Sequence, residues 1–550
     1  MVNNIIKNGT SFLLAKQTSI FSAAAVIMTT VMASRLLGLL RNRLLTSQFN
    51  PDEIGIYLAA FRLPTMMFEL LIMGALSTAF IPVFTKILTR DSEAKAWHVA
   101  SSVINISVII FSVASTFILI FTEPIAKMIA PGLNNEELAQ MISFTRIMLV
   151  GQAPFLIIGS FLTGILQSYK HFLIPALAPV VYNLGIIFGI IFLGPFFWLY
   201  GPVIGVVLGS MLFVLVQIPI VRHIGYSHSK DLDYKDIRVR EIGRLTLPRV
   251  MGLAVSQVNT TVNLALSSLL GTRNITIFSF AQQLDQFPVT LFGATIAQAT
   301  LPTLSEEEAK GNKEEFKQIF INSLNQILFL ILPAAAMVII LRIPLVRLAF
   351  GAVKFDWDAT VLTGRTLAFF GLGLAAEGVT HLFVRGYYAL HDSKTPMFLG
   401  VFAVVINILL SLVFICVIKL PIWALALSTS VSDIIYVAFL VIFLNKKVGG
   451  FDKEKITKPF LKMLIATLLT GISLYIPMKL LDQLVFDTTR TVNLILLTTV
   501  AGICGLSVYI FFSYLLKIPE LSMVMTIAKK IKSLPKTFKD SQTLVENAGS

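Results

Sequence analysis

The chain has 550 residues, of which 56% are hydrophobic and only 13% are charged. Soluble globular proteins carry about 25% charged residues, so this composition excludes a soluble domain and indicates a polytopic membrane protein. The formal net charge is +14. Most of the cations fall in predicted loops on one side of the membrane, so no nucleic-acid partner is needed to explain them.

Predominantly apolar runs of roughly 20 residues mark the predicted membrane helices, because that length crosses the hydrocarbon core. The polar-in alternation of a membrane β-barrel is absent, so an all-α fold with about 14 transmembrane helices is expected. The first run lacks a cleavage site, so the N-terminus is expected to be retained. The predicted spans are 18–40, 54–84, 98–121, 138–166, 173–193, 198–221, 242–269, 276–304, 316–341, 361–390, 396–418, 421–444, 459–480 and 491–517.

The distribution of Lys and Arg predicts the orientation of these helices. If the N-terminus is inside, the inside loops hold most of the basic residues, including those of 222–241 and 445–458. The positive-inside rule therefore predicts that both termini are cytoplasmic. The basic tail at 518–550 contains AKKIKSLPKTFK. It either lies on anionic lipid headgroups or is a solvated, disordered tail.

The cysteines and one group of glycines within the spans indicate helix packing rather than a functional site. Cys416 and Cys504 lie in apolar runs and are expected to be free, buried thiols rather than a disulfide. Gly201, Gly205 and Gly209 share one face of the sixth predicted helix, which indicates close helix packing.

An internal repeat divides the chain into two lobes. IYLAAFRLPTMMFELLIMGALSTAFIPVF at 56–84 resembles IFSFAQQLDQFPVTLFGATIAQATLPTL at 277–304, and QSYKHFLIP, ending at Pro175, matches ALHDSKTP, ending at Pro396, at almost the same displacement. The displacement spans six helices, so two six-helix lobes related by a pseudo-two-fold axis along the membrane normal are predicted, with chance similarity as the alternative. The expected domains are an N-terminal lobe (1–221), a cytoplasmic linker (222–241), a C-terminal lobe (242–444), two further helices (445–517) and the tail (518–550).

Two such lobes enclose a central cavity, and rocking one against the other would give alternating access. Charged side chains in a span are costly, so those present face a cavity or a partner. Arginine predominates among them, and its planar fork suits phosphate, so an anionic substrate is predicted. The candidate substrate-binding residues are Arg35, Arg41, Arg62, Arg249 and Arg385. Arg35 and Arg41 are too far apart around a helix to form one stripe, but both can line one wide pocket.

Other polar residues in the spans are candidates for support or coupling: Glu69, Asp285, Glu377, Asn259, Asn263 and Asn407. Asp285 and Glu377 could neutralise arginines or bind a proton or cation. Asn259 and Asn263 could join Asn407 and Ser411 in a cation site, or form ordinary hydrogen bonds between helices. No cofactor, catalytic residue or metal ligand is predicted, apart from a coupling cation (sodium or proton) or the use of the membrane potential.

Several motifs occur together in this order: SRLLGLLRNRLL, AAFRLP, GALSTAFIPVF, LPRVMGLAVSQVN and RGYYALHDSKTP. In this combination the chain resembles the MurJ (MviN) family of bacterial lipid II flippases, in the multidrug/oligosaccharidyl-lipid/polysaccharide (MOP) exporter superfamily. The resemblance covers essentially the whole chain. It implies a V-shaped cationic cavity, a groove for a lipid tail between the last two helices, and transport of the undecaprenyl-pyrophosphate-linked peptidoglycan precursor to the outer leaflet. It also implies that Arg35 and Arg41 meet the pyrophosphate.

The chain departs from the family pattern after the LP of the second span. Phe68 and Glu69 stand where many members have paired arginines, and Met73 replaces a glutamate. Gly55 stands where many members have an aspartate, and Gln283 where they have an arginine. Because a carboxylate would repel an anionic lipid, we expect Glu69 to be held by a cation from another helix or to point out of the cavity.

Alternatives to a lipid II flippase are a flippase for another polyprenyl-linked glycan, a drug exporter, a polyprenyl-dependent transferase and a cell-wall scaffold without transport activity. The transferase is disfavoured because only His381 lies well inside a span and no carboxylates cluster near it. The expected partners are lipid II, membrane lipids and cell-wall synthesis proteins. A monomer in the bacterial cytoplasmic (inner) membrane is expected.

Overall fold

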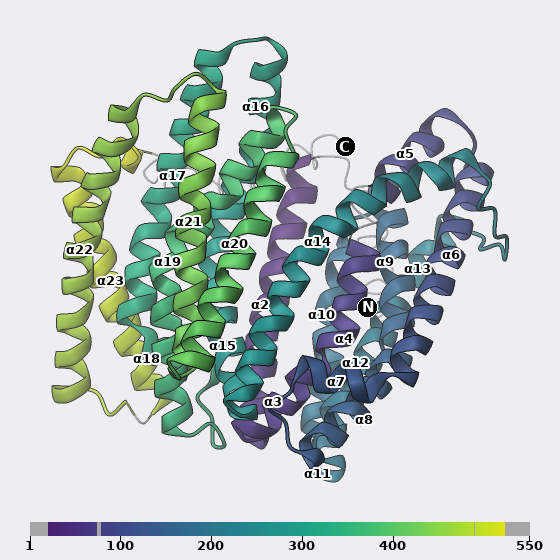
Figure 1. The fold of residues 1–550 in the computed structure, drawn as a ribbon, viewed down its shortest axis with the longest axis horizontal. Coiled ribbons are helices and arrows are strands. Elements are labelled where there is room, and N and C mark those ends of the chain that lie inside the picture. Colours follow the sequence, from purple (N-terminus) through teal and green to yellow (C-terminus); the bar gives the residue numbers. More distant parts are fainter. Residues whose placement is uncertain (1–19, 74–78, 489, 523–550) are drawn as a thin grey trace, which may run out of the picture. The chain divides into compact units, whose positions relative to one another are not determined.

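The structure is a computed structural model, and it describes residues 20–73, 79–488 and 490–522 (Figure 1). Every regular element within these residues is a helix, as the composition predicts. Both ends of the chain, including the tail from residue 523 onward, lie outside the described residues, so the positions of the termini stay predictions.

Elements of wider, π-type turn are labelled η. The elements of the first part of the chain are α2 (Ile20–Gln48), α3 (Pro51–Ala60), α4 (Arg62–Phe68), η1 (Glu69–Met73), α5 (Ile81–Arg90), α6 (Glu93–Ile120), α7 (Thr122–Ile129), α8 (Asn135–Gly151), α9 (Ala153–Ser168), α10 (Leu173–Phe188), η3 (Gly189–Leu193), α11 (Gly194–Phe197), α12 (Tyr200–Leu215), α13 (Ile218–His223) and α14 (Ile237–Leu269). Those that follow are α15 (Thr272–Pro288), η4 (Val289–Ala294), α16 (Thr295–Ala309), α17 (Lys313–Ile340), α18 (Arg342–Phe350), α19 (Trp357–Ala389), α20 (Lys394–Leu412), η5 (Val413–Val417), α21 (Trp423–Lys447), α22 (Lys453–Leu484) and α23 (Thr491–Leu515).

Ten helical stretches within the described residues are long and apolar enough to cross a membrane. They coincide with ten of the predicted spans. The other four predicted spans are 18–40, 54–84, 242–269 and 276–304, which are the first two of each predicted lobe. They correspond to α2, the interrupted run α3–α5, α14 and the run α15–α16. These four hold most of the candidate polar residues, and the total of about 14 spans stays a prediction.

The chain forms two compact units. The first consists of residues 1–280, 349–363 and 407–425, and the second of 281–348, 364–406 and 426–550. These units do not coincide with the lobes 1–221 and 242–444, because α14 belongs to the first unit. The predicted lobe boundaries therefore stay predictions.

Unusual backbone conformations recur in the two halves of the chain, at the same displacement as the sequence repeat. Lys170 and His391 are both left-handed, with φ of 63° and 55°. Trp198 and Lys419, at the same displacement, are left-handed as well, with φ of 53° and 59°. Positive φ is uncommon outside glycine, so two such pairs in one register support the internal repeat independently of side-chain similarity. The π-turn Glu69–Met73 likewise has a counterpart at Val289–Ala294.

Glycines bring α10 and α12 together in the first unit. A Cβ atom added at Gly185 would lie 2.3 Å from the Cα of Gly209, and one at Gly189 would lie 2.5 Å from the Cα of Gly205. Only glycine allows so close an approach of two backbones. The packing face predicted from Gly201, Gly205 and Gly209 is therefore present.

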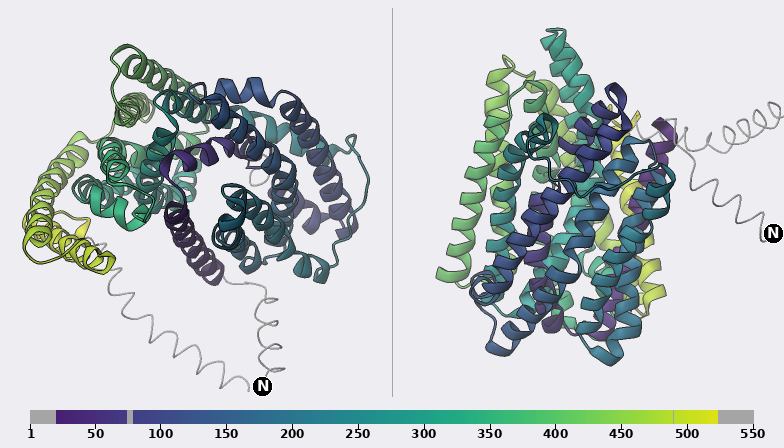
Figure 2. Two further views of the ribbon diagram at one scale, coloured as in Figure 1. Left: turned by 90° about the horizontal axis from the view of Figure 1, so that it is seen from below. Right: turned by 90° about the vertical axis from the view of Figure 1, so that its right-hand side faces the viewer.

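In the second unit, α22 and α23 lie side by side near the C-terminal end of the described chain (Figures 1 and 2). The hydroxyl of Tyr509 on α23 donates a hydrogen bond of 2.8 Å to the backbone oxygen of Phe329 on α17. Leu341, Leu474 and Ala501 form a buried cluster. The lipid-tail groove that the family resemblance implies between α22 and α23 stays a prediction.

Cys416 and Cys504 are free thiols, as predicted. The expected burial is wrong for Cys416, which is exposed, while Cys504 is half-buried. An apolar run in a membrane protein faces lipid as well as protein, so apolar sequence neighbours do not imply contact with other helices.

The carboxylate of Asp392, in the short loop between α19 and α20, should make the stability of the protein depend on pH. The carboxylate of Asp392 accepts hydrogen bonds from Lys447 Nζ (2.6 Å), Thr395 Oγ1 (2.7 Å) and the backbone N of Thr395 (3.0 Å). Partial burial opposes ionisation, but the bonds from Lys447 and Thr395 outweigh it and lower the pKa of Asp392 to about 2. A lowered pKa means that the carboxylate stabilises the fold above its unfolded pKa of about 3.9, and that this contribution disappears as the pH falls to about 2.

We therefore expect Asp392→Asn to lower the free energy of unfolding by about 1 kcal/mol at neutral pH, since the ion pair is only partly shielded from solvent. Thermal unfolding of the purified protein measured from about pH 7 to pH 3 should show the gap to wild type closing below about pH 4. A gap that stays constant with pH would contradict the assignment to this carboxylate.

Candidate functional site

A cavity of about 660 Å³ lies within the first unit. Its walls come from α2, α4, η1, α9, α10 and α12, so predicted spans one, two, four, five and six contribute to it. Most of its lining is apolar. The polar side chains that line it include Ser34, Arg35, Glu69, Gln152, Gln167 and Tyr182.

Arg35 is the arginine that lines this cavity. Its side chain is exposed, and within the described residues it has no hydrogen-bond or ion-pair partner. Beside it, Gln152 donates a hydrogen bond of 3.1 Å to the hydroxyl of Tyr182, while the Oε1 atom of Gln152 is buried without a partner. The cavity thus presents one unpaired guanidinium and one unused acceptor to a ligand.

Arg41 lies outside the lining of this cavity and is held by neighbouring side chains. Its Nη1 donates to Asn183 Oδ1 on α10 at 3.2 Å, and its Nε donates to Asn42 Oδ1 at 3.1 Å. It also interacts electrostatically with the hydroxyls of Tyr57 and Tyr182. The structure therefore separates the two arginines of the motif, with Arg35 in the cavity and Arg41 fixed against α10.

Arg62 is buried and belongs to a polar network with α14. Its Nη2 donates to the backbone oxygen (2.7 Å) and to Oε1 (2.8 Å) of Gln257, and its Nε donates to Thr261 Oγ1 (3.0 Å). The Nε2 of Gln257 donates in turn to Glu69 Oε2. Only one orientation of the Gln257 amide satisfies both neighbours, so this residue links a guanidinium to a carboxylate.

The position of Glu69 differs from the expected one. Glu69 lines the cavity, and its described hydrogen-bond partner is the neutral amide of Gln257 rather than a cation on another helix. Arg62 acts on it at longer range through the same network. The sequence analysis did not single out Gln257, because it is one of many polar residues in the span 242–269.

Gly55 has a steric role in this conformation. A Cβ atom at this position would lie 2.0 Å from the backbone oxygen of Thr272. Similarly, a Cβ at Gly132 would lie 1.9 Å from the backbone oxygen of Ser268, whose hydroxyl accepts a hydrogen bond from the Gly132 amide at 3.1 Å. The aspartate that the family resemblance implies at the Gly55 position would not fit here. The C-terminal end of α14, at Ser268, and the start of α15, at Thr272, therefore pack on the neighbouring segments at glycines.

The other predicted substrate-binding arginines lie apart from the cavity lining. Arg249 is exposed on α14. Arg385, in the second unit, donates a hydrogen bond of 2.8 Å to the backbone oxygen of Ala294. Their assignment to a substrate stays a prediction.

The predicted coupling residues fall into two groups. In the first unit, Asn407 Nδ2 donates to Asn259 Oδ1 at 2.7 Å, and Ser411 Oγ donates to Asn407 Oδ1 at 3.3 Å. Asn263 lies four residues after Asn259 on α14. Its side chain is buried, and its Oδ1 has no hydrogen-bond partner. Oxygens of this kind suit a monovalent cation or interhelical hydrogen bonds equally, so neither alternative is eliminated.

In the second unit, the carboxyl groups of Asp285 and Glu377 interact electrostatically, and Oδ1 of Asp285 is buried without a hydrogen-bond partner. Gln286 also donates a hydrogen bond to Glu377, and Asp433 interacts electrostatically with it. Two ionised carboxylates close together repel each other, so a proton or cation at this pair would relieve that repulsion. The described residues contain no group of three or more His, Cys, Asp or Glu side chains placed to hold a metal ion.

Comparison with known proteins identifies the family. The family model described as "Lipid II flippase MurJ" matches residues 52–491. A probable lipid II flippase MurJ from Bdellovibrio bacteriovorus is 25% identical over 511 residues, which cover 92% of this chain and 96% of that protein. One from Thermotoga maritima is 26% identical over 497 residues, covering 90% and 96%.

Solved structures agree in fold. A lipid II flippase MurJ in an inward closed conformation matches with a TM-score of 0.74 at 23% identity, covering 89% of this chain and 98% of that one. An inward-facing multidrug resistance MATE family transporter of the MOP superfamily matches with a TM-score of 0.64 at 14% identity, covering 78% and 98%. Because the family model spans most of the sequence, the chain belongs to the lipid II flippase MurJ family.

Proposed function

We propose that this protein carries lipid II from the cytoplasmic to the outer leaflet of the bacterial inner membrane by alternating access. The observation that carries the proposal is family membership over residues 52–491, together with an unpaired arginine in a cavity of the first unit. Lipid II joins an anionic pyrophosphate to a glycan and a polyprenyl chain. Arg35 would bind the pyrophosphate, because a guanidinium can donate two parallel hydrogen bonds to phosphate oxygens.

The carboxylate of Glu69 does not oppose this assignment. Gln257 donates to it, and Arg62 lies behind that amide, so the charge of Glu69 is partly balanced inside the network. Arg41 would add positive potential from its place against Asn183. The cavity therefore keeps a net attraction for an anion although Phe68 and Glu69 replace the paired arginines found in many relatives.

Alternating access is supported by the way α14 and the start of α15 meet the preceding segments of the first unit. Several of these contacts are polar or involve glycine: the Arg62–Gln257–Glu69 network, the Gly132–Ser268 contact and the packing of Gly55 on Thr272. Such contacts can separate without exposing a large apolar surface. Because α14 opens the second predicted lobe, their rupture would let that lobe rock away.

A second candidate is a flippase for another polyprenyl-linked glycan. The observation that favours it is the loss of the paired arginines at positions 68 and 69, which changes the contacts available to the substrate headgroup. A cell-wall scaffold without transport is the remaining alternative. We assign no enzymatic activity to the chain.

Energy coupling would use the buried acids of the second unit. Asp285 and Glu377 interact electrostatically, and a proton or sodium ion bound at this pair would relieve their repulsion. The cluster of Asn259, Asn407 and Ser411 is a second candidate for a cation, and the membrane potential is a third source of energy. Both termini are proposed to be cytoplasmic on the basis of the Lys and Arg distribution.

Rescue of a bacterium depleted of its own lipid II flippase tests the proposal. We expect the wild-type chain to restore growth, and the purified protein in vesicles to move labelled lipid II between leaflets. Separate sodium, proton and voltage gradients across those vesicles would identify the coupling source. Movement of a different polyprenyl-linked glycan but not lipid II would favour the second candidate, and rescue without movement of either lipid would favour a scaffold.

A further inference from the structure

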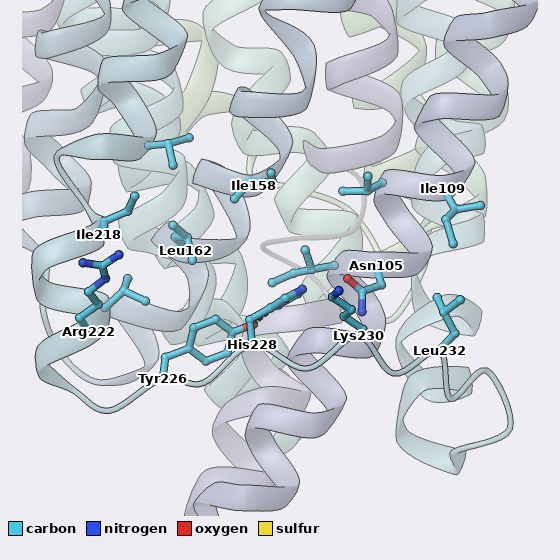
Figure 3. Close-up of a pocket in the computed structure, with 14 residues that line it drawn as sticks. Asn105, Ile109, Ile158, Leu162, Ile218, Arg222, Tyr226, His228, Lys230 and Leu232 are labelled. Atoms are coloured by element: carbon cyan, nitrogen blue, oxygen red, sulfur yellow. Dashed lines mark hydrogen bonds between the residues drawn. The ribbon is translucent and has the colours of Figure 1, made fainter.

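A second cavity, of about 590 Å³, lies elsewhere in the first unit and shares no lining residue with the cavity of Arg35. It lies where α6, α9, α12 and α13 meet the segment 224–236 that follows α13. Figure 3 shows Arg222, Tyr226, His228 and Lys230 along one edge of it, with Ile158, Leu162 and Ile218 beyond them. We call this second cavity the linker recess.

The linker recess combines an apolar wall with a basic rim. Its wall is made of aliphatic side chains from four helices, including Val108 on α6, Ile158 and Leu162 on α9 and Ile218 on α13. Its rim carries Arg222 and Lys230, both exposed. Within the described part of the chain, neither of these two cations has a hydrogen-bond or ion-pair partner for its side chain.

The rim is held in place by hydrogen bonds to α6. Asn105 Nδ2 donates to the backbone oxygens of Ser229 and Asp231, both at 2.9 Å. The backbone N of Ser229 donates to Ser101 Oγ at 3.1 Å. The hydroxyl of Tyr226 contacts the same Ser101 oxygen at 3.2 Å and His228 Nδ1 at 3.0 Å. Lys230 therefore projects from an anchored segment rather than from a free loop.

The acidic residues of the segment are engaged elsewhere. Asp231 and Asp233 contact opposite ring nitrogens of His98, at 3.2 and 3.4 Å. Neither aspartate lines the linker recess. The rim therefore keeps a net positive charge although acids are near in sequence.

We propose that the linker recess is a binding site for an anionic glycerophospholipid of the bilayer. Basic pockets between membrane helices, on the side predicted here to be cytoplasmic, suit anionic lipid headgroups. The headgroup phosphate would lie at the basic rim, and one acyl chain would cover Val108, Ile158 and Leu162. A soluble phosphate would use the cations but leave the aliphatic wall uncovered, so the wall favours a lipid over a free anion.

Native mass spectrometry of the purified full-length chain tests the site, with phosphatidylglycerol and phosphatidylcholine as the probes. We expect wild type to retain phosphatidylglycerol preferentially. The double variant Arg222→Gln, Lys230→Gln should weaken that binding roughly thirtyfold, at about fivefold for each cation near the surface. The matched control is Arg90→Gln with Lys170→Gln, which removes one Arg and one Lys from exposed positions that do not line the recess. We expect the control to bind like wild type.

A variant in the apolar wall tests whether the ligand is a lipid or a free anion. Val108→Trp fills the apolar part and leaves both cations, so it should weaken phosphatidylglycerol binding while the protein elutes as folded monomer. Competition by soluble glycerol phosphate against wild type is expected to be weak. The proposal fails if the control loses as much binding as the rim variant, if the rim variant binds like wild type, or if glycerol phosphate displaces the lipid and Val108→Trp has no effect. These measurements detect lipid binding and not transport. The lipid-site proposal can therefore be wrong while the flippase assignment holds, and the reverse.

Discussion

Replacing Arg35 by alanine is expected to abolish rescue of a strain depleted of its lipid II flippase, with the amount of protein in the membrane unchanged. Arg35 lines the cavity and has no described partner, so its loss removes a ligand contact and little packing. Hydrogen bonds to charged groups contribute about 1.5 to 3 kcal/mol, so losing a two-bond fork should lower the flipping rate in vesicles roughly a hundredfold or more. Arg35→Lys keeps the charge without the fork and should retain part of the activity.

The matched control for this experiment is Arg90→Ala, which removes an exposed arginine that does not line the cavity. It should rescue growth like wild type. Arg41→Ala should lower activity and also lower thermal stability, because Arg41 is bonded to Asn183 and Asn42. Full rescue by Arg35→Ala at normal abundance would refute the assignment of this residue to the pyrophosphate.

Replacing Arg62 by methionine is expected to destabilise the protein by about 3 kcal/mol, since it removes one partner of a buried charged network. Gln257 and Thr261 would lose their donor, and Glu69 would keep an unbalanced charge. Glu69→Gln alone should cost less than about 1 kcal/mol, because the side-chain oxygen of glutamine can still accept from Gln257. The measurement is thermal unfolding of each purified variant in one detergent.

The double variant distinguishes a network from two independent residues. With Glu69→Gln present, Arg62→Met no longer leaves an unbalanced carboxylate, so its cost should fall by about 1 kcal/mol or more. Additive costs would show that Arg62 and Glu69 do not interact. Transport by Glu69→Gln at the wild-type rate would support a structural role for this carboxylate, whereas an inactive but stable Glu69→Gln would assign it to cation coupling.

The structure changes the physical reason for expecting an effect at Arg62. From the sequence, an arginine in the second span suggested positive potential in a substrate cavity. In the structure its guanidinium is buried and donates to Gln257, 195 residues away in the chain. No pattern within one helix reports such a partner, because helical periodicity gives the face of a side chain but not the neighbour that the face meets.

The sequence by itself determined the membrane class, the positions of ten of the spans, the internal repeat and the family motifs. These depend on local quantities: the length of apolar runs, the spacing of Pro and Gly, and the cost of charges in lipid. The left-handed backbone at Lys170 and His391 repeats because the two turns are local structures with related sequences.

Only the tertiary structure decided which arginine lines the cavity. Arg35 and Arg41 stand in one motif on α2, yet one faces the cavity and the other is bonded to Asn183, 142 residues away. The same is true of the linker recess, whose rim comes from α13 and the segment after it, while its wall comes from four helices. A long, flexible arginine side chain has many low-energy rotamers, and the surrounding helices select among them. Its role is therefore set by distant residues that pack around it, and those contacts exist only in the folded chain.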